Sequence, residues 1–357
     1  MLEHVDDVER LLPQILDIES VSGDERHLAD LVQATLGSYD HLQVTRLGNV
    51  IVARTSWGRP ERVVIAGHLD TVPVMDNLPS RRGLRDGRPA VYGRGAVDMK
   101  AGVAIQVNLA ATLANAARDI TWVFYDCEEV EATRNGLGHL VAARPDLIAG
   151  DLAILMEPTG GRLEGGCQGT LRAEIRTYGV AAHSARSWLG HDAIHDMADA
   201  LAVLRRYESH TVMVDGLAYR EGLNAVGISG GVAGNVIPDR CQMLVNYRFA
   251  PDKSVEEATA IVREAFAGYE LEIVDAAAGA RPGLSQPAVA SLVRAVGVEV
   301  APKYGWTDVA RFAAQSIPGI NWGPGDPNLA HTVDENVLID EVLGCRDALR
   351  GWLIGAV

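Results

Sequence analysis

The sequence is poor in positive charge and in long apolar runs, and each shortage excludes a class of protein. Its 357 residues hold 32 Lys and Arg against 47 Asp and Glu, a formal net charge of −15. This charge argues against nucleic acid or an anionic membrane surface as a partner. No run approaches transmembrane length, and the N-terminus lacks the basic and apolar regions of a signal peptide. We therefore expect a cytoplasmic protein.

Cysteine is also scarce, and no C-x-x-C pair occurs, so a thiolate zinc site is not expected. Scattered buried thiols in a reducing compartment are the simpler interpretation of Cys127, Cys167, Cys241 and Cys345. The acidic balance has a second consequence. If the substrate is anionic, the site must supply its own positive charge through metal ions and arginines.

Strands and helices alternate through the first 160 residues, and the chain length favours two domains. We predict an α/β fold with a mostly parallel sheet covered by helices on both faces. Residues 76–93, rich in Gly, Pro and Arg, are expected to form a loop. The predicted helices are 3–17, one that ends near Leu36, 101–117 and one that begins at Asn135; the predicted strands are 42–46, 49–55, 61–67, 120–125 and 152–156.

The pattern changes near Gly165-Gly-Cys-Gln-Gly169. A strand, a helix, two or three strands between 211 and 249, a helix and a strand then follow, in the β-α-β-β-α-β order of a ferredoxin-like unit. We interpret 169–278 as an inserted domain and 1–168 with 279–357 as the catalytic domain. The elements predicted in this half are 171–178, 191–206, 254–267, 270–275, 286–297 and 339–354.

The stretch Val63-Val-Ile-Ala-Gly-His-Leu-Asp-Thr-Val-Pro73 ends a buried strand with His68 and Asp70. Strand alternation would project both side chains to the same side. A neutral imidazole is a common metal ligand, and a nearby carboxylate fixes its tautomer. We predict that His68 binds a metal and that Asp70 supports it, although a His-x-Asp can also be an ordinary strand end.

Four further residues at element ends complete a candidate ligand set with His68: Asp98, Glu129, Glu157 and His331. Sites on parallel sheets lie at the carboxyl ends of the strands. Two imidazoles and three carboxylates suit zinc, manganese or cobalt and argue against calcium. One carboxylate bridging two ions, with one His and one Glu on each, would make two equivalent half-sites.

Glu128 and Glu129 are adjacent, so their side chains point apart at a strand end and are not expected to bind the same ion. We assign Glu129 as a ligand and Glu128 as a general base close to the metals. Taken alone, two such acids would more often be solvated at the start of a loop, and His331 would more often be a surface residue. Their joint occurrence carries the prediction.

The chain resembles the dizinc aminoacylase–carboxypeptidase family, whose members hydrolyse N-acyl amino acids and related amides. The resemblance spans essentially the whole chain and rests on GHLDTVP, YGRGAVDMK, DCEEV, LMEP, HSARSWLG, NVIPD and AHTVDE. It implies that His68 and Glu157 hold one zinc, that Glu129 and His331 hold the other, and that Asp98 bridges. It also implies Glu128 as the base and a cis peptide between Asp98 and Met99.

In such relatives the equivalent of His183 reaches the partner subunit's site and donates to the oxyanion. The resemblance therefore implies a homodimer, formed through the inserted domain, which would also close as a lid. Asn235 and Arg248 match substrate contacts in relatives, and Arg is suited to capture a carboxylate with two hydrogen bonds. A surface charge on a strand face is the alternative for Arg248.

Trp306-Thr-Asp-Val-Ala-Arg-Phe312 resembles a segment of succinyl-diaminopimelate desuccinylases, and the chain is similar to their shorter actinobacterial type. Thr307 and Arg311 are therefore candidates for holding the succinyl carboxylate, with a structural ion pair as the alternative for Arg311. Relatives outside this type carry an Arg-rich segment at the position of Cys167-Gln168-Gly169-Thr170. Which residues bind the succinyl carboxylate in this chain is therefore left open.

The resemblance implies hydrolysis of N-succinyl-LL-2,6-diaminopimelate to succinate and LL-diaminopimelate, in lysine and cell-wall precursor synthesis. Two divalent ions are expected, with zinc ahead of cobalt or manganese. Acetylornithine deacetylase, another N-acyl-amino-acid hydrolase or a dipeptidase is the alternative enzyme. A catalytically silent dimeric binding protein is the alternative from another class, and the intact ligand set counts against it.

Overall fold

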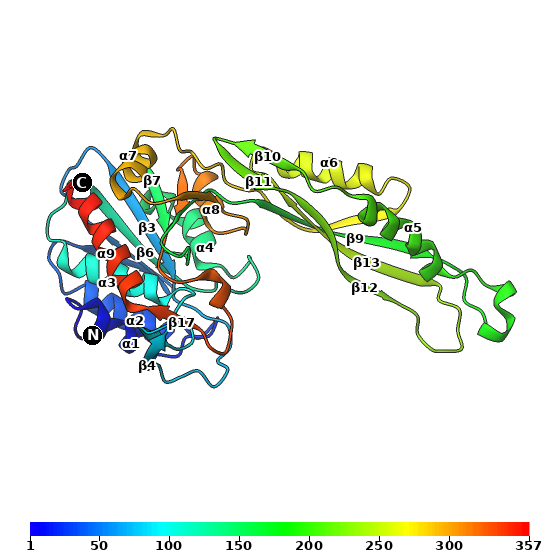
Figure 1. The fold of residues 1–357 in the computed structure, drawn as a ribbon, viewed down its shortest axis with the longest axis horizontal. Helices are drawn as coiled ribbons and strands as arrows, with labels where there is room; N and C mark the ends of the chain where they lie inside the picture. The colour runs from blue at the N-terminus through cyan, green and yellow to red at the C-terminus, as the bar shows by residue number, and fades with distance from the viewer. Residues whose placement is uncertain (357) are drawn as a thin grey trace. The chain divides into compact units, whose positions relative to one another are not determined.

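The computed structural model describes residues 1–356, and the chain forms two compact units (Figure 1). Unit 1 comprises Met1–Gly166, Pro282–Ala301 and Asp308–Val357, and unit 2 comprises Cys167–Arg281 and Pro302–Thr307. Among residues 1–356, no helix has both the length and the apolar character that a membrane span requires.

Unit 1 is built on an eight-stranded mixed sheet of order β1-β2-β6-β3-β7-β16-β8-β15. At its centre β3 is parallel to β6 and β7, and β7 is parallel to β16. These strands are continuous apolar runs because both faces of the sheet are covered. The strands are β1 (Gln43–Leu47), β2 (Val50–Arg54), β3 (Arg62–His68), β6 (Asp119–Tyr125), β7 (Leu152–Leu155), β8 (Leu163–Gly165), β15 (Val300–Pro302) and β16 (Gly319–Asn321).

Helices pack on both faces of this sheet, which confirms the predicted α/β fold. One face carries α1 (Val8–Leu16), α2 (Arg26–Leu36), α3 (Lys100–Thr112), α7 (Pro287–Val296) and α9 (Ile339–Ile354). The other carries α4 (Gly136–Ala143) and α8 (Val309–Ala313), with short 3-10 turns at Pro145–Leu147 and Pro327–Leu329. Two predicted ends were wrong: α1 begins only after its Asp7 cap, and α3 ends at Thr112.

Helix α3 lies unusually close to the sheet. A Cβ atom on Gly102 would lie 2.5 Å from the carbonyl oxygen of Met156, so only glycine fits at this position. The close approach places the start of α3, just after Asp98, beside the end of β7 and Glu157. The small apolar residues of this helix thus bring two of the predicted ligands together.

The prediction of a loop over 76–93 was wrong. Residues in this stretch form a hairpin of β4 (Arg81–Arg85) and β5 (Arg88–Tyr92), which β17 (Asn336–Leu338) extends to three strands. Asp86 and Gly87 have φ of 52° and 79°, as a two-residue type I′ turn requires. The Asp-Gly pair was the available signal, and the high Arg and Pro content obscured it.

Unit 2 has a four-stranded antiparallel sheet of order β12-β13-β9-β14, the ferredoxin-like arrangement predicted from the element order. Two helices cover one face, and the other face carries charged and polar side chains. Four strands, not two or three, lie between 211 and 249, because β10 and β11 form a separate hairpin. The elements are β9 (Gly169–Tyr178), a 3-10 turn (Ser184–Leu189), α5 (Ala193–Arg206), β10 (Thr211–Val214), β11 (Leu217–Arg220), β12 (Gly222–Gly230), β13 (Arg240–Phe249), α6 (Val255–Ala265) and β14 (Glu270–Ala277).

Candidate metal centre

The predicted ligands of unit 1 gather at one edge of its sheet. His68 is the last residue of β3, and the segments with Glu129 and Glu157 leave the ends of the neighbouring strands β6 and β7. Since these three strands are parallel, their carboxyl ends meet at the same edge. Asp98 and His331 reach this edge from loops.

Two groups of possible ligands share Asp98. One group is His68, Asp98 and Glu157, and the other is Asp98, Glu129 and His331; within each group the ligand atoms lie within 4.8 Å of one another. Asp98 Oδ1 lies 3.1 Å from His68 Nε2, and its Oδ2 lies 3.3 Å from His331 Nε2. His331 Nε2 lies 2.9 Å from Glu129 Oε1. Asp98 is thus a member of both three-residue groups and contacts the histidine of each.

The pKa values of the two histidines indicate whether this group of side chains suits cations. The carboxylates of Asp98 and Glu129, which accept from His331 Nε2, raise the pKa of His331 to about 10. Burial would lower the pKa of His68, but the Asp70 and Asp98 carboxylates raise it well above its ordinary value. Both shifts have one cause, an excess of negative charge at the sheet edge, and that charge attracts divalent cations as it attracts protons. The donor set therefore fits a pair of such ions.

Asp70 contacts both His68 and the backbone of the Glu128-Glu129 segment. Its backbone carbonyl accepts from His68 Nδ1 at 3.0 Å, while its carboxylate is 3.5 Å from that nitrogen. The carboxylate accepts the backbone N–H groups of Glu128 and Glu129, each at 3.0 Å. Burial would raise the pKa of Asp70, but His68 and these N–H groups lower it to about 2. Asp70, predicted to support His68, therefore contacts His68 and also positions the Glu128-Glu129 backbone.

Glu128 lies near the centre but belongs to neither of the groups that share Asp98. Its carboxylate comes within 4.8 Å of donor atoms of His68 and Glu129. Burial, together with the negative charges of Asp308, Glu157 and Glu129, raises the pKa of Glu128 well above its ordinary value, against the opposing charge of His68. A carboxylate that binds a proton this readily is suited to accept one during a reaction.

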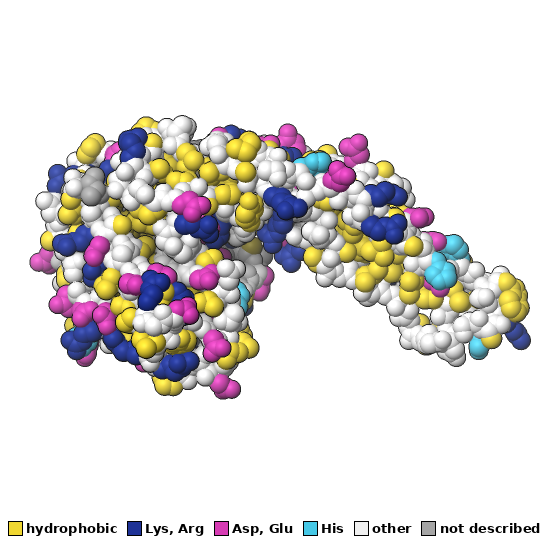
Figure 2. All heavy atoms as spheres, viewed as in Figure 1, with side chains coloured by type: hydrophobic (Ala, Val, Ile, Leu, Met, Phe, Trp, Pro, Cys, Tyr) yellow, Lys and Arg dark blue, Asp and Glu magenta, His cyan; other side chains and the backbone are white. Residues whose placement is uncertain are grey.

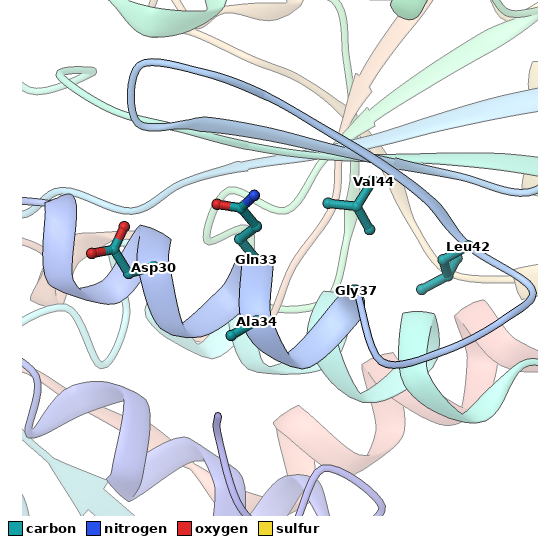
Figure 3. Close-up of a pocket in the computed structure, with 6 residues that line it drawn as sticks. All are labelled: Asp30, Gln33, Ala34, Gly37, Leu42 and Val44. Atoms are coloured by element: carbon teal, nitrogen blue, oxygen red, sulfur yellow. The ribbon is translucent and has the colours of Figure 1, made fainter.

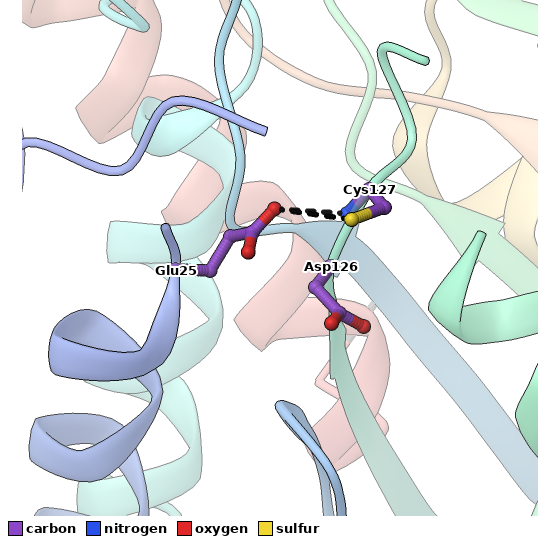
Figure 4. A group of neighbouring side chains, drawn as sticks. All are labelled: Glu25, Asp126 and Cys127. Carbon is purple, nitrogen blue, oxygen red and sulfur yellow. Dashed lines mark hydrogen bonds between the residues drawn. The ribbon is translucent and has the colours of Figure 1, made fainter. Parts of the chain in front are cut away.

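Asp126 and Cys127, the two residues before Glu128, form a further group of possible ligands with Glu25 (Figure 4). The backbone N–H and the thiol of Cys127 both donate to Glu25 Oε1, at 3.2 and 3.5 Å. Burial raises the pKa of the Cys127 thiol to about 12, so the sulfur stays protonated and acts as a donor. This group ties the segment before Glu128 to the start of α2.

Glu335 is a residue that sequence reasoning missed. Its carboxylate accepts backbone N–H groups of the loop that carries Asp98 and pairs with Arg94, which is equally buried. The peptide between Asp98 and Met99 in this loop is cis, as the resemblance implied. Arg94 and Glu335 both fall within motifs used for the resemblance, but no spacing rule connects residues so far apart.

His183, Asn235, Arg248 and Thr307 lie in unit 2, whereas Arg311 lies in unit 1. The loops of His183 and Asn235 run side by side, with the Ser184 N–H donating to the Asn235 carbonyl at 2.9 Å. His183 and Asn235 are both exposed.

Arg248 is half-buried and has no carboxylate partner among the described residues. Its Nε donates to Asn246 Oδ1 at 3.1 Å, and Asn246 Nδ2 donates to Thr170 Oγ1 at 3.1 Å. Burial and the neighbouring charge of Arg172 lower the pKa of Arg248. A guanidinium oriented through Nε and left without an anion is a ready receptor for a carboxylate.

Arg311, in contrast, is paired. Its Nε contacts Asp308 Oδ1, and Asp308 Oδ2 accepts from Asn135 Nδ2 at 2.9 Å. Asn135 caps α4 through the N–H of Gly138. The structural ion pair considered for Arg311 is therefore present, and it joins α8 to α4. Thr307 is buried, and its carbonyl faces the Cys167 thiol.

A hollow between α2 and β1 contains none of these ligands (Figure 3). Its one ionisable lining residue, Asp30, is paired with Arg46 from β1. The rest of the lining is amide, small or apolar: Gln33, Ala34, Gly37, Leu42 and Val44.

The chain is similar to known proteins over most of its length. A family model for peptidase family M20/M25/M40 matches residues 64–354. A protein of Mycobacterium tuberculosis, provisionally named succinyl-diaminopimelate desuccinylase, is 51% identical over 99% of this chain and 100% of its own length. The succinyl-diaminopimelate desuccinylase of Corynebacterium glutamicum is 44% identical over 96% and 95%. The Bacillus subtilis YXEP protein, described as a dinuclear metal-binding peptidase of the M20 family, has the same fold, with a TM-score of 0.70 at 15% identity over 99% and 98%.

Metal loading should release protons. With pKa values raised to about 10 for His331 and well above the ordinary value for His68, both imidazoles are protonated near neutral pH in the metal-free chain. A metal binds only the neutral imidazole, so apparent Zn²⁺ affinity should rise between about pH 6 and pH 8, with about one proton released per ion. Titration in weak buffer with a pH indicator measures this. His331→Ala should lose one release step and His139→Ala none; an affinity that does not change with pH would contradict the assignment.

Proposed function

We propose that this chain, which belongs to peptidase family M20/M25/M40, hydrolyses N-succinyl-LL-2,6-diaminopimelate to succinate and LL-diaminopimelate. The observation that carries the proposal is near-full-length likeness to two proteins named for this activity. The two ligand groups that share Asp98 support a metal-dependent amide hydrolase. The four free thiols fit the cytoplasm, our proposed location.

In this proposal His68 and Glu157 would hold one divalent ion, Glu129 and His331 would hold the other, and Asp98 would be shared by both. Zinc is the proposed metal, and cobalt and manganese suit the same donors. When bound, such a pair of ions polarises a carbonyl group and lowers the pKa of water between them.

Glu128 is the proposed general base. Its carboxylate takes the proton of the attacking water and later gives it to the nitrogen of the leaving amine. Asp70 keeps Glu128 in place through the backbone N–H at 3.0 Å. His183 of a second copy of the chain would donate to the oxygen of the tetrahedral intermediate, a role that rests on the family resemblance.

Arg248 is the proposed receptor for a substrate carboxylate, because it is oriented by Asn246 and has no anion of its own among the described residues. Asn235 is a further proposed substrate contact. Thr307 and Arg311 stay candidates for the succinyl group. Arg311 is already paired with Asp308, so we favour Arg248 as the carboxylate receptor.

We propose that the inserted domain, 169–278, pairs two copies of the chain. The outer strand β12 has a neighbour only on one side among residues 1–356. Val226 and Ile228 on this strand are more than half exposed, and Ile194 and Leu201 on the adjacent α5 are exposed too. Apolar side chains lie open among charged ones over unit 2 in Figure 2. An apolar, unpaired strand edge is a template for pairing with another chain.

An acetylornithine deacetylase or a dipeptidase would use the same metal centre, so only the substrate separates these activities. We expect the metal-loaded protein to cleave N-succinyl-LL-2,6-diaminopimelate with kcat/KM at least about 100-fold above that for acetylornithine or a dipeptide, a gap of about 2.7 kcal/mol. Chelation should abolish turnover, and added Zn²⁺ should restore it. Preference for acetylornithine would refute the substrate assignment, and turnover undiminished after chelation would refute the metal centre.

Two substitutions should separate chemistry from binding. Glu128→Gln should keep the bound metal and lower kcat by about 10²–10⁴-fold, because general-base catalysis is lost. Arg248→Met should raise KM by about 10–100-fold with a smaller change in kcat, because a hydrogen-bonded charge pair contributes about 1.5–3 kcal/mol. Steady-state kinetics on matched metal-loaded samples measure both. Normal turnover by Glu128→Gln would show that another group is the base.

The proposed dimer can be tested at the outer strand. Ile228→Asp should give a monomer in light scattering, because a charge on the strand edge opposes pairing. Leu84→Asp, at an apolar residue of unit 1 that is also more than half exposed, is the matched control and should leave the assembly unchanged. A dimer that persists in Ile228→Asp and dissociates in Leu84→Asp would place the interface elsewhere.

A further inference from the structure

We propose that Glu335 is the positioning residue that joins the two halves of the metal centre, holding the loop of Asp98 and the loop of His331 in a fixed relation. The inference deepens the proposed function and rests on its two-ion centre. It assigns to Glu335 no contact with metal or substrate.

The Glu335 carboxylate accepts four hydrogen bonds from the loop that carries Asp98. Oε1 accepts the backbone N–H groups of Val97 and Asp98, at 2.9 and 3.1 Å. Oε2 accepts the Gly95 N–H at 3.1 Å and Arg94 Nη1 at 2.7 Å. Four donors saturate the acceptor sites of a carboxylate, so this one side chain contacts the loop at four successive points.

The backbone around Glu335 ties the same two loops together. Its carbonyl accepts the Gly93 N–H at 3.0 Å, and the strand that begins at the next residue, β17, pairs with β5. Arg94 also reaches the Thr332 carbonyl, at 3.4 Å. His331 stands four positions before Glu335, so the carboxylate anchors Asp98 from the segment that also presents His331.

Burial makes this link specific to a carboxylate. Glu335 and Arg94 side chains are each 1% exposed, so water cannot replace a lost partner. A glutamine would keep one acceptor oxygen and turn an NH₂ group toward Arg94 and the Gly95 N–H, which are both donors. An aspartate keeps the charge but is one methylene shorter, so it cannot reach both ends of the loop.

Asp98 belongs to both ligand groups, so a shift of its backbone disturbs both ions at once. Groups that orient metal ligands typically change metal affinity or activity by about 10–100-fold when removed. We expect that loss in Glu335→Gln and a smaller one in Glu335→Asp. The ion held by His331 should lose more affinity than the other ion, because Glu335 connects the loop of Asp98 to the loop of His331.

The experiment is a Zn²⁺ titration of the metal-free full-length protein against a chromogenic chelator, with thermal unfolding measured in parallel. Glu335→Gln should bind the weaker ion about 10–100-fold less tightly while circular dichroism stays that of the wild type. In the metal-loaded enzyme, kcat should fall with KM nearly unchanged.

Glu221→Gln in unit 2 is the matched control. Glu221 is also a buried carboxylate, and it accepts from the Ala250 N–H at 2.7 Å, the Tyr247 hydroxyl at 3.0 Å and Lys253 Nζ at 2.9 Å. This variant should lose stability and keep both zinc affinities. If Glu335→Gln loses stability as Glu221→Gln does and binds zinc like the wild type, Glu335 is only structural and the proposal is overturned.

Hydrogen exchange of the wild type keeps the test decisive if the variants do not fold. The amides of Val97 and Asp98 should be protected in the metal-free chain, because Glu335 holds them without an ion; free exchange there would overturn the proposal. None of these readouts needs the substrate. Wild-type protein that binds two ions but leaves the succinyl amide intact would therefore refute the proposed substrate and leave the role of Glu335 standing.

Discussion

Negative charge concentrated at one edge of a parallel sheet is the constraint on which the rest of this structure depends. Buried carboxylates are costly unless donors surround them. Here the donors are largely the backbone N–H groups of the segments that carry other carboxylates, as when Asp70 binds the N–H groups of Glu128 and Glu129. Each acidic residue thus holds the next, and the excess charge that remains is available to cations.

The surrounding fold positions the residues at this edge. Three parallel strands deliver His68 and the segments of Glu129 and Glu157 to one place, and α3 can approach because Gly102 has no side chain. The small β4-β5-β17 sheet guides the loops of Asp98 and His331. Catalytic groups on loops need such rigid support, since metal affinity depends on how well the ligands are placed in advance.

In unit 2, Arg248 differs from the neighbouring arginines because it has no carboxylate partner among residues 1–356. On the same face of the sheet, Arg172 and Arg176 are paired with acids. Arg311 of unit 1 is also paired, with Asp308, which is why we propose Arg248 and not Arg311 as the contact for a substrate carboxylate. In a chain of net charge −15, a half-buried arginine with no carboxylate partner among residues 1–356 is a specific feature.

The sequence by itself determined the α/β class and the ferredoxin-like order of unit 2, and it picked out the His and carboxylate residues that gather at the sheet edge, because hydrophobic periodicity and residues at strand ends are local signals. It missed the β4-β5 hairpin, where Arg and Pro obscured a turn signal. Only the tertiary structure decided that Asp98 stands between two ligand sets, that Arg311 is paired and that Glu335 joins two loops. Those contacts connect residues far apart in the chain, and no periodic pattern encodes them, because they exist only once the sheet has brought the loops together.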